Sequence, residues 1–280
     1  MPLTEEDWLR QITADRDNDE LRLVFADWLE EQGDSARAEF IRVQIRLAAM
    51  PADDSAERET LFERQMAFLE AHGDAWLAKM PKVLRPGCLF VRGFMADLDC
   101  LTVRWLRYGK RVQQAYPLLQ ALTLNSGRFG RRNKFLVSPF LTQLTSLAII
   151  KNPIGDKGAT ALATSLHISR LTDLTLWGCN INVRGALALS ASPYLTRLNT
   201  LMLRSNLLFD AGATALASAP HLAQLTLLDL ADNRIGDAGA AALADSPHLA
   251  QLTTLRLENN LIGEAGVEAL RERFGNAVVI

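Results

Sequence analysis

The sequence of 280 residues lacks a long uncharged apolar run, so no segment reaches the roughly 18 residues that a membrane-spanning helix needs. It has three cysteines, Cys88, Cys100 and Cys179, and no Cys-x-x-Cys pair, which argues against a disulfide framework and a zinc site. Its first ten residues have neither the basic nor the apolar region of a secretory signal. We therefore expect a soluble cytoplasmic protein with reduced cysteines, no membrane association and a monomeric state.

Catalytic motifs are also missing from the sequence. No Gly-x-Ser-x-Gly, no His-Glu-x-x-His and no supported Cys/His pair occurs. Asp15, Asp17 and Asp19 alternate as at the start of a calcium loop, but Glu20 and Ala26 stand where that loop needs glycine and glutamate. The glycines and lysine of residues 127–134 do not have the spacing of a phosphate-binding loop. The sequence thus predicts no enzyme, no cofactor and no metal.

Acidic residues are absent from residues 100–155, which carry nine basic residues, whereas residues 1–80, the acidic head, carry 19 acidic and nine basic ones. We call the following residues the basic collar: Arg104, Arg107, Lys110, Arg111, Arg128, Arg131, Arg132 and Lys134. The collar could bind nucleic acid, or it could neutralise the acidic head of the same molecule. Tethering favours the second alternative, so we expect the collar to dock on the head and not to bind nucleic acid.

A repeat of 27 residues occupies the second half of the chain, starting at Leu144, Leu171, Leu198, Leu225 and Leu252. Each unit opens Leu-x-x-Leu-x-Leu/Ile, and in four units an asparagine follows at the ninth position. Alternating leucines predict a short strand with one buried face, and the following Gly-Ala-x-Ala-Leu pattern predicts a helix. A weaker unit precedes them, with Leu119, Leu122, Leu124 and Phe129 in register and Gly127 in place of the asparagine.

These units resemble leucine-rich repeats, and their helical part resembles the ribonuclease-inhibitor-like subclass. The resemblance implies an α/β horseshoe with parallel strands inside and helices outside. Asn152, Asn206, Asn233 and Asn260 are expected to form a ladder that bonds unpaired backbone groups, and Cys179 takes that structural place in the second unit. We further predict that Asp156, Asp210 and Asp237 cap the helices of their own units. Val183 replaces the aspartate in the second unit, so a shorter or looser helix is expected there.

His221 and His248 stand one repeat apart, a spacing that could stack them on neighbouring coils as a metal pair. Phe140, His167 and Tyr194 hold the same position in other units, so an amphipathic turn residue is sufficient explanation. Residues 88–117 read as a strand and a helix that cap the first coil. At the other end, a helix ending at Gly275 and an edge strand over residues 277–280 are expected.

Strands spaced about 4.8 Å apart and backed by wider helices must curve with the strands on the inside. The side chains between the buried leucines then form a concave face rich in aromatic, apolar and arginine side chains, the composition of an interaction hot spot. The predicted partner-binding residues are Ile150, Trp177, Met202, Arg204, Leu227, Asp229 and Arg256. Trp177 could instead cover the edge of its own coil, and Asp229 is expected in a solvated row of ion pairs with Arg204 and Arg256.

The acidic head has helical periodicity throughout. Thr4 and Asp7 predict the start of a first helix, Gly33 ends a second, and further helices are expected over about 35–49 and 55–71. Residues 22–44 resemble the N-terminal repeat-companion domain of bacterial paralogue families. That resemblance covers residues 3–48 and implies an architecture without an established activity.

Together these features predict an all-α domain over residues 1–80, a cap over 81–118 and a leucine-rich-repeat solenoid over 119–280. The predicted function is a non-catalytic scaffold that binds an unidentified protein on its concave face. Nucleic-acid binding through residues 104–134 is the alternative, and action on a GTPase, as for some similar repeats, has no supporting feature here.

Overall fold

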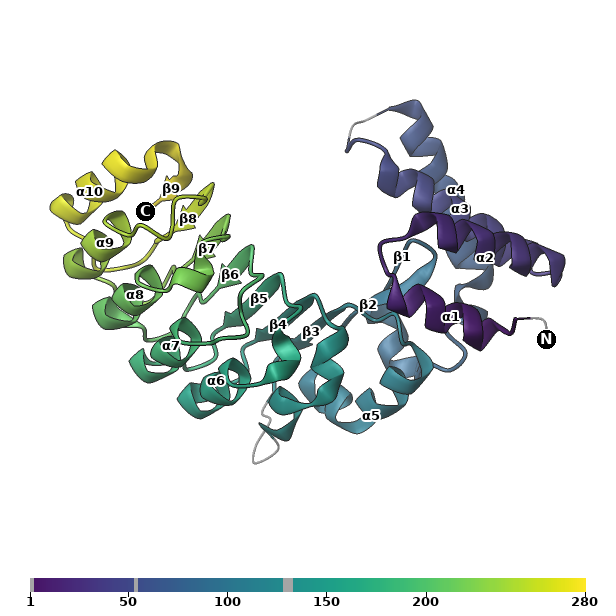
Figure 1. The fold of residues 1–280 in the computed structure, drawn as a ribbon, viewed down its shortest axis with the longest axis horizontal. Coiled ribbons are helices and arrows are strands. Elements are labelled where there is room, and N and C mark those ends of the chain that lie inside the picture. The colour runs from purple at the N-terminus through teal and green to yellow at the C-terminus, as the bar shows by residue number, and fades with distance from the viewer. Residues whose placement is uncertain (1–2, 53–54, 128–132) are drawn as a thin grey trace. The chain divides into compact units, whose positions relative to one another are not determined.

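The computed structural model describes residues 3–52, 55–127 and 133–280 (Figure 1). The chain divides into two compact units: unit 1 comprises Met1–Leu98 and Tyr108–Leu119, and unit 2 comprises Asp99–Arg107 and Gln120–Ile280. Strand β2 (Phe94–Leu101) and helix α5 (Thr102–Ala115) contribute residues to both. The predicted domain boundaries after residues 80 and 118 stay a proposal. In the described ranges no helix combines the length and the apolar character needed to cross a membrane.

Unit 1 begins with the helices α1 (Glu5–Ala14), α2 (Asp19–Glu31), α3 (Ser35–Ala49) and α4 (Ala56–Trp76). The predicted start of α1 is confirmed: the Thr4 side chain accepts the Asp7 N–H at 3.3 Å, and the Asp7 carboxylate accepts the Thr4 N–H at 3.1 Å. Helix α4 runs past its predicted end at residue 71. Its last turn is held because the Trp76 ring packs against Phe40 of α3, with ring centroids 4.7 Å apart.

A β-hairpin follows a short 3₁₀ helix (Lys82–Gly87), where the sequence predicted a single strand. Strand β1 (Cys88–Val91) pairs antiparallel with β2 through a two-residue turn, Arg92–Gly93. Both turn residues have positive φ angles, +50° and +87°, as a tight primed hairpin turn requires. A Cβ at position 93 would lie 2.3 Å from Ile41 Cγ1, so only glycine lets the turn approach α3 this closely. The Gly93 N–H donates to Gln44 Oε1 at 2.6 Å.

The core of unit 1 is formed by apolar side chains from α1, α2, α3, β2 and the segment that follows α5. Its buried members are Trp8, Ile12, Phe25, Ala26, Leu29, Ala38, Ile41, Ile45, Phe94 and Leu118. Two aspartates at the junction of α1 and α2, Asp17 and Asp19, lie outside this core and pair with the hairpin turn. Arg92 lies 3.4 Å from Asp19 and 3.7 Å from Asp17. Polar pairing therefore accounts for two of the three acids that resembled a calcium loop.

Unit 2 stacks parallel strands in sequence order, along the inner side of a curve in Figure 1. The strands are β3 (Ala121–Asn125), β4 (Ser146–Ile150), β5 (Asp173–Trp177), β6 (Thr200–Met202), β7 (Leu227–Asp229), β8 (Thr254–Arg256) and β9 (Val278–Val279). From β4 to β8 each residue pairs with the residue one repeat later, as Leu174 does with Leu201 and Leu201 with Leu228. The buried leucines confirm the predicted register, and β3 and β9 confirm the weaker first unit and the terminal strand.

Helices on the outer side complete the coils of unit 2 (Figure 1). They are α6 (Gly155–Ala163), α7 (Val183–Ser190), α8 (Phe209–Ala217), α9 (Asp237–Ala244) and α10 (Glu264–Phe274), with short 3₁₀ helices at Asn133–Val137, Pro139–Gln143, Leu166–Ile168, Pro220–Leu222 and Gly275–Ala277. Parallel strands inside, helices outside and a helical part ahead of them confirm the predicted leucine-rich-repeat horseshoe.

The predicted helix caps are wrong in one respect, because the aspartates cap the helix of the next coil. Asp156 and Asp210 lie inside the first turn of their own helices. Asp210 Oδ1 accepts the N–H groups of Gly236 and Gly239, at 2.6 and 3.1 Å, at the start of α9. Asp156 does the same for α7. Helix α7 has eight residues, as α9 does, and is one residue shorter than α6 and α8, so Val183 is accompanied by little of the expected shortening.

The asparagine ladder is confirmed. Asn206 Oδ1 accepts the N–H groups of Cys179 and Ile181, at 3.1 and 3.0 Å, and its amide donates to Leu176 O at 2.7 Å. Cys179 takes the ladder position in its own coil, where its thiol lies 3.2 Å from Ile149 O.

At the first coil, Thr102 supplies the hydroxyl that donates to Asn152 Oδ1 at 2.8 Å. Gly127 makes room for it, since a Cβ there would lie 2.8 Å from Thr102 Cβ. A residue from the start of α5 thus completes the ladder where the repeat itself has no asparagine.

Candidate functional site

The concave face of unit 2 consists of three side chains from each coil. In the coil that starts at Leu144 they are Ser146, Ala148 and Ile150, which alternate with the buried Leu147 and Ile149. Along β4 and β5, buried and half-buried residues alternate strictly. The half-buried side chains of successive strands lie side by side, as Ile150 does with Trp177. The predicted residues Ile150, Trp177, Met202, Arg204 and Leu227 are all half-buried, and Arg256 is exposed. The register therefore brings these six residues onto one accessible face.

A polar cluster surrounds Trp177 on this face. The indole N–H donates to Ser205 Oγ at 3.2 Å, and the Ser205 hydroxyl donates to Asp232 Oδ2 at 3.4 Å. Asp232 also accepts a charged hydrogen bond from Arg204 Nε at 3.0 Å. The Arg204 guanidinium carbon lies 6.0 Å from the Trp177 ring centroid, and Lys151 Nζ lies 5.6 Å from it. We call Lys151, Trp177, Arg204, Ser205 and Asp232 the tryptophan cluster.

Three members of this cluster, Lys151, Ser205 and Asp232, are not among the predicted binding residues. Each directly precedes the ladder position of its coil and has a φ angle between +53° and +58°. At this left-handed residue the chain leaves the direction of the strand. Its side chain therefore lies at the edge of the concave face. The repeat register contained a signal for them, because position eight of successive units is polar or glycine: Lys151, Gly178, Ser205, Asp232 and Asn259.

Asp229 does not form the solvated row of ion pairs that the sequence predicted. It is only 4% exposed, and its Oδ1 accepts the Ala231 N–H at 3.0 Å. Arg204 pairs with Asp232 instead. Burial raises the pKa of Asp229, an effect that the Ala231 N–H and the charges of Arg204 and Arg256 only partly offset. A carboxylate that is costly to ionise therefore lies on the floor of this face.

The basic collar is distributed over both units. Lys110 and Arg111 belong to unit 1, whereas Arg104, Arg107 and Lys134 belong to unit 2. Arg128, Arg131 and Arg132 lie outside the described residues, as does Phe129. Lys110, Arg111 and Lys134 form no ion pair with an acid in the part of the chain that the structure describes. Docking of the collar on the acidic head stays a prediction.

The repeat histidines are turn residues. Pro220–Leu222 forms a 3₁₀ turn around His221, and desolvation lowers the pKa of this histidine. Among the residues that the structure describes, no group of three His, Cys, Asp or Glu side chains is arranged to hold a metal ion.

Comparison with known proteins supports the repeat assignment. The family model described as "Leucine Rich repeat" matches residues 141–163 and 221–244, so the chain carries leucine-rich repeats. A search of curated proteins gave no match. Among solved structures, the chain is similar to an internalin from Listeria monocytogenes, with 20% identity and a TM-score of 0.36. That match covers 58% of this chain and 47% of the internalin, so it spans about half of that chain and says nothing about what this protein binds.

Proposed function

We propose that the protein is a non-catalytic interaction scaffold whose concave face binds a protein partner. The observation that carries this proposal is the tryptophan cluster. A half-buried indole, two cations within 6.0 Å of its ring and an arginine fixed by Asp232 stand on one accessible strand face. Tryptophan and arginine dominate the binding energy of protein interfaces. Side chains already held in place lose less conformational entropy when a partner binds.

Apolar side chains flank this cluster. Ile150 pairs in register with Trp177, while Met202 and Leu227 lie on the next two strands. Half-buried aliphatic groups beside an aromatic and arginine centre have the composition of an interface core. We propose Ile150, Trp177, Met202, Arg204 and Leu227 as the contact centre, with Arg256 at its exposed edge and Asp229 beneath it.

Alanine variants of the cluster test this proposal. Trp177→Ala and Arg204→Ala should each weaken partner binding by about 2 kcal/mol or more, as hot-spot residues do. The thermal midpoint should change little, because neither side chain is in the core. Binding is measured by capture on the immobilised full chain, quantitative mass spectrometry and then titration of the captured partner.

A second aromatic and arginine pair in the same unit provides the matched control. Arg234 lies 6.0 Å from the ring centroid of Phe209, which is exposed at the start of α8. Phe209→Ala and Arg234→Ala should leave binding unchanged. If Trp177→Ala lowers stability by several kcal/mol while binding persists, Trp177 is a structural residue and the proposed contact centre is wrong.

Several finer assignments belong to the same proposal. The helical continuation of each repeat supports the ribonuclease-inhibitor-like subclass, and residues 22–44 support a bacterial repeat-companion domain ahead of it. We also propose the division into residues 1–80, 81–118 and 119–280, a monomeric state and a cytoplasmic location.

Nucleic-acid binding through the basic collar is the alternative function. Its support is the run of residues 100–155, which has nine basic and no acidic residues. Binding of this kind would weaken steeply with salt, because each neutralised phosphate releases counterions. Retention of RNA or DNA that falls with salt and is lost in the Arg128→Glu/Arg131→Glu/Arg132→Glu variant would favour this alternative.

A further inference from the structure

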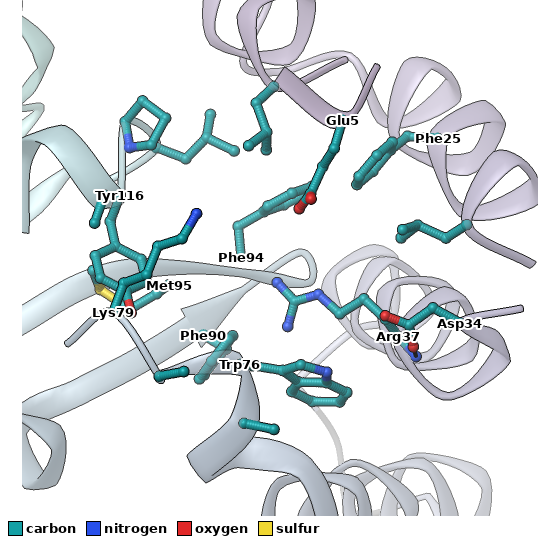
Figure 2. Close-up of a pocket in the computed structure, with 17 residues that line it drawn as sticks. Glu5, Phe25, Asp34, Arg37, Trp76, Lys79, Phe90, Phe94, Met95 and Tyr116 are labelled. Carbon is teal, nitrogen blue, oxygen red and sulfur yellow. Dashed lines mark hydrogen bonds between the residues drawn. The ribbon is translucent and has the colours of Figure 1, made fainter. Parts of the chain in front are cut away.

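Unit 1 contains a cavity of about 330 Å³, and every residue that lines it belongs to that unit (Figure 2). Its inner wall includes the buried residues Phe25, Phe94 and Met95, and Trp76, Phe90 and Tyr116 complete an aromatic lining. Its rim carries exposed charged side chains, Glu5, Asp34 and Lys79. A small cavity with mostly apolar walls and a few polar groups is typical of sites for small molecules.

Arg37 places its guanidinium inside this cavity, between Trp76 and Phe94 (Figure 2). The guanidinium carbon lies 4.7 Å from the Trp76 ring centroid, 5.3 Å from that of Phe90 and 5.6 Å from that of Phe94. Phe40 lies 5.8 Å away, so four aromatic rings surround the charge, and cation–π attraction offsets part of the free energy of desolvation. Burial nevertheless lowers the pKa of Arg37 to about 10, against the opposing charges of Asp34 and Glu5.

One donor of the Arg37 guanidinium lacks an acceptor in the part of the chain that the structure describes. Its Nη1 is buried and without a hydrogen-bond partner among the described residues. Asp34 accepts only the backbone N–H of Arg37, at 3.1 Å, and Arg37 takes part in no ion pair with a described acid. A buried donor on a charged group costs free energy until an acceptor is supplied. The unpaired Nη1 therefore points to a ligand with an anionic acceptor.

We propose that this cavity binds a small monocarboxylic acid with an aromatic or aliphatic body, whose carboxylate pairs with Arg37. A carboxylate matches the planar donor geometry of guanidinium. The rim carries two acids against the single cation of Lys79, which disfavours a dianion such as a phosphate monoester. The aromatic walls supply the surface on which the ligand's apolar body is buried. This inference is independent of the proposed function, because the tryptophan cluster belongs to unit 2.

The test uses the full chain, with 3-phenylpropionate as probe and isothermal titration calorimetry as readout. We expect saturable binding of the acid, and binding of 3-phenylpropionamide and of phenyl phosphate at least about tenfold weaker. Arg37→Met, which keeps an unbranched, flexible side chain and removes the charge and the donors, should weaken binding of the acid at least about tenfold. Arg10→Met, at an exposed arginine of α1, should leave it unchanged, as should Trp177→Ala.

Several results would overturn the proposal. They are no saturable binding of 3-phenylpropionate up to about 10 mM, equal binding of acid and amide, or tighter binding of phenyl phosphate. An Arg37→Met variant that folds and binds like the wild type would do the same. If Arg37→Met fails to fold, the comparison of acid with amide on the wild-type chain decides the question alone.

Discussion

The side chain of Asp229 is buried, and its surroundings only partly stabilise the ionised carboxylate. Because burial raises its pKa in the folded state, the folded chain holds this proton more tightly than the unfolded chain does. The contribution of Asp229 to stability is therefore most favourable at low pH, and it declines as the pH rises through the ordinary value of 3.8 and then through the raised one.

Asp229→Asn should raise the free energy of unfolding at pH 7 by about 1 kcal/mol, since an amide oxygen can still accept the Ala231 N–H without carrying a charge. The difference from the wild type should shrink towards pH 3. Urea titrations across this pH range provide the measurement, with Asp173→Asn, a half-exposed acid on β5, as control. A variant that is less stable at pH 7 would show that Arg204 and Arg256 stabilise the ionised form more than burial opposes it.

The reactivity of the three cysteine thiols provides a second test at the scale of the residue. All three are free, Cys100 and Cys179 are buried, and Cys88 is half-buried. Burial raises the pKa of Cys88 to about 11 and that of Cys179 to about 12. Thiols in the native chain should react with Ellman's reagent at pH 8 about a hundredfold more slowly than in the unfolded chain, because the thiolate is the reactive form. Cys88→Ser should remove most of the remaining native reaction, and rapid labelling of the native Cys88→Ser variant would contradict the burial of Cys100 and Cys179.

At the scale of the element, each aspartate cap joins two consecutive coils. Asp210→Ala should cost about 1–2 kcal/mol, because it removes the acceptor for two N–H groups at the start of α9. Hydrogen exchange should accelerate at Gly236 and Gly239 and not within α8, where Asp210 itself lies. Asp245→Ala, at the exposed C-terminal end of α9, serves as the matched control. Faster exchange confined to α8 would instead support capping within one coil.

The elements of the repeats could be predicted because their signals are local and periodic. Leu174, Leu201 and Leu228 repeat at the strand spacing, and helix α3 has its predicted bounds because Asp34 and Ser35 follow the helix-ending Gly33. The exchange of caps between coils could not be predicted, since a single unit does not show which helix start lies beside its aspartate. Thr102 was missed for a similar reason, because its partner Asn152 is 50 residues away.

The candidate sites show the same limit. Trp177 and Arg204 were identifiable because the repeat register places them on the strand face. Asp232, which fixes Arg204, was missed because it lies beyond the strand, at the left-handed position that directly precedes the ladder asparagine. The aromatic surroundings of Arg37 could not be predicted from the sequence, because the rings come from α3, α4 and the hairpin. Long-range packing decides both features.

On the scale of the whole molecule, unit 2 should unfold as one cooperative solenoid, because each coil buries its leucines against its neighbours. Leu228 is fully buried, so Leu228→Ala should cost roughly 2–5 kcal/mol in a denaturant titration. Leu187→Ala, at a side chain 49% exposed on α7, should cost no more than about 0.5 kcal/mol. A loss below about 0.5 kcal/mol for Leu228→Ala would mean that the repeat register is wrong.

Site-specific photo-crosslinking tests the central claim, partner binding on the concave face, most directly. A photoreactive amino acid replaces either Met202, on the strand face beside the tryptophan cluster, or Leu187, on the outer helix α7. Both variants are expressed in cells of the native host and illuminated, and the crosslinked proteins are identified by mass spectrometry. We predict a discrete protein partner crosslinked from position 202 and not from position 187, and lost when Trp177→Ala is added. Crosslinking of that partner from position 187 alone would contradict the account.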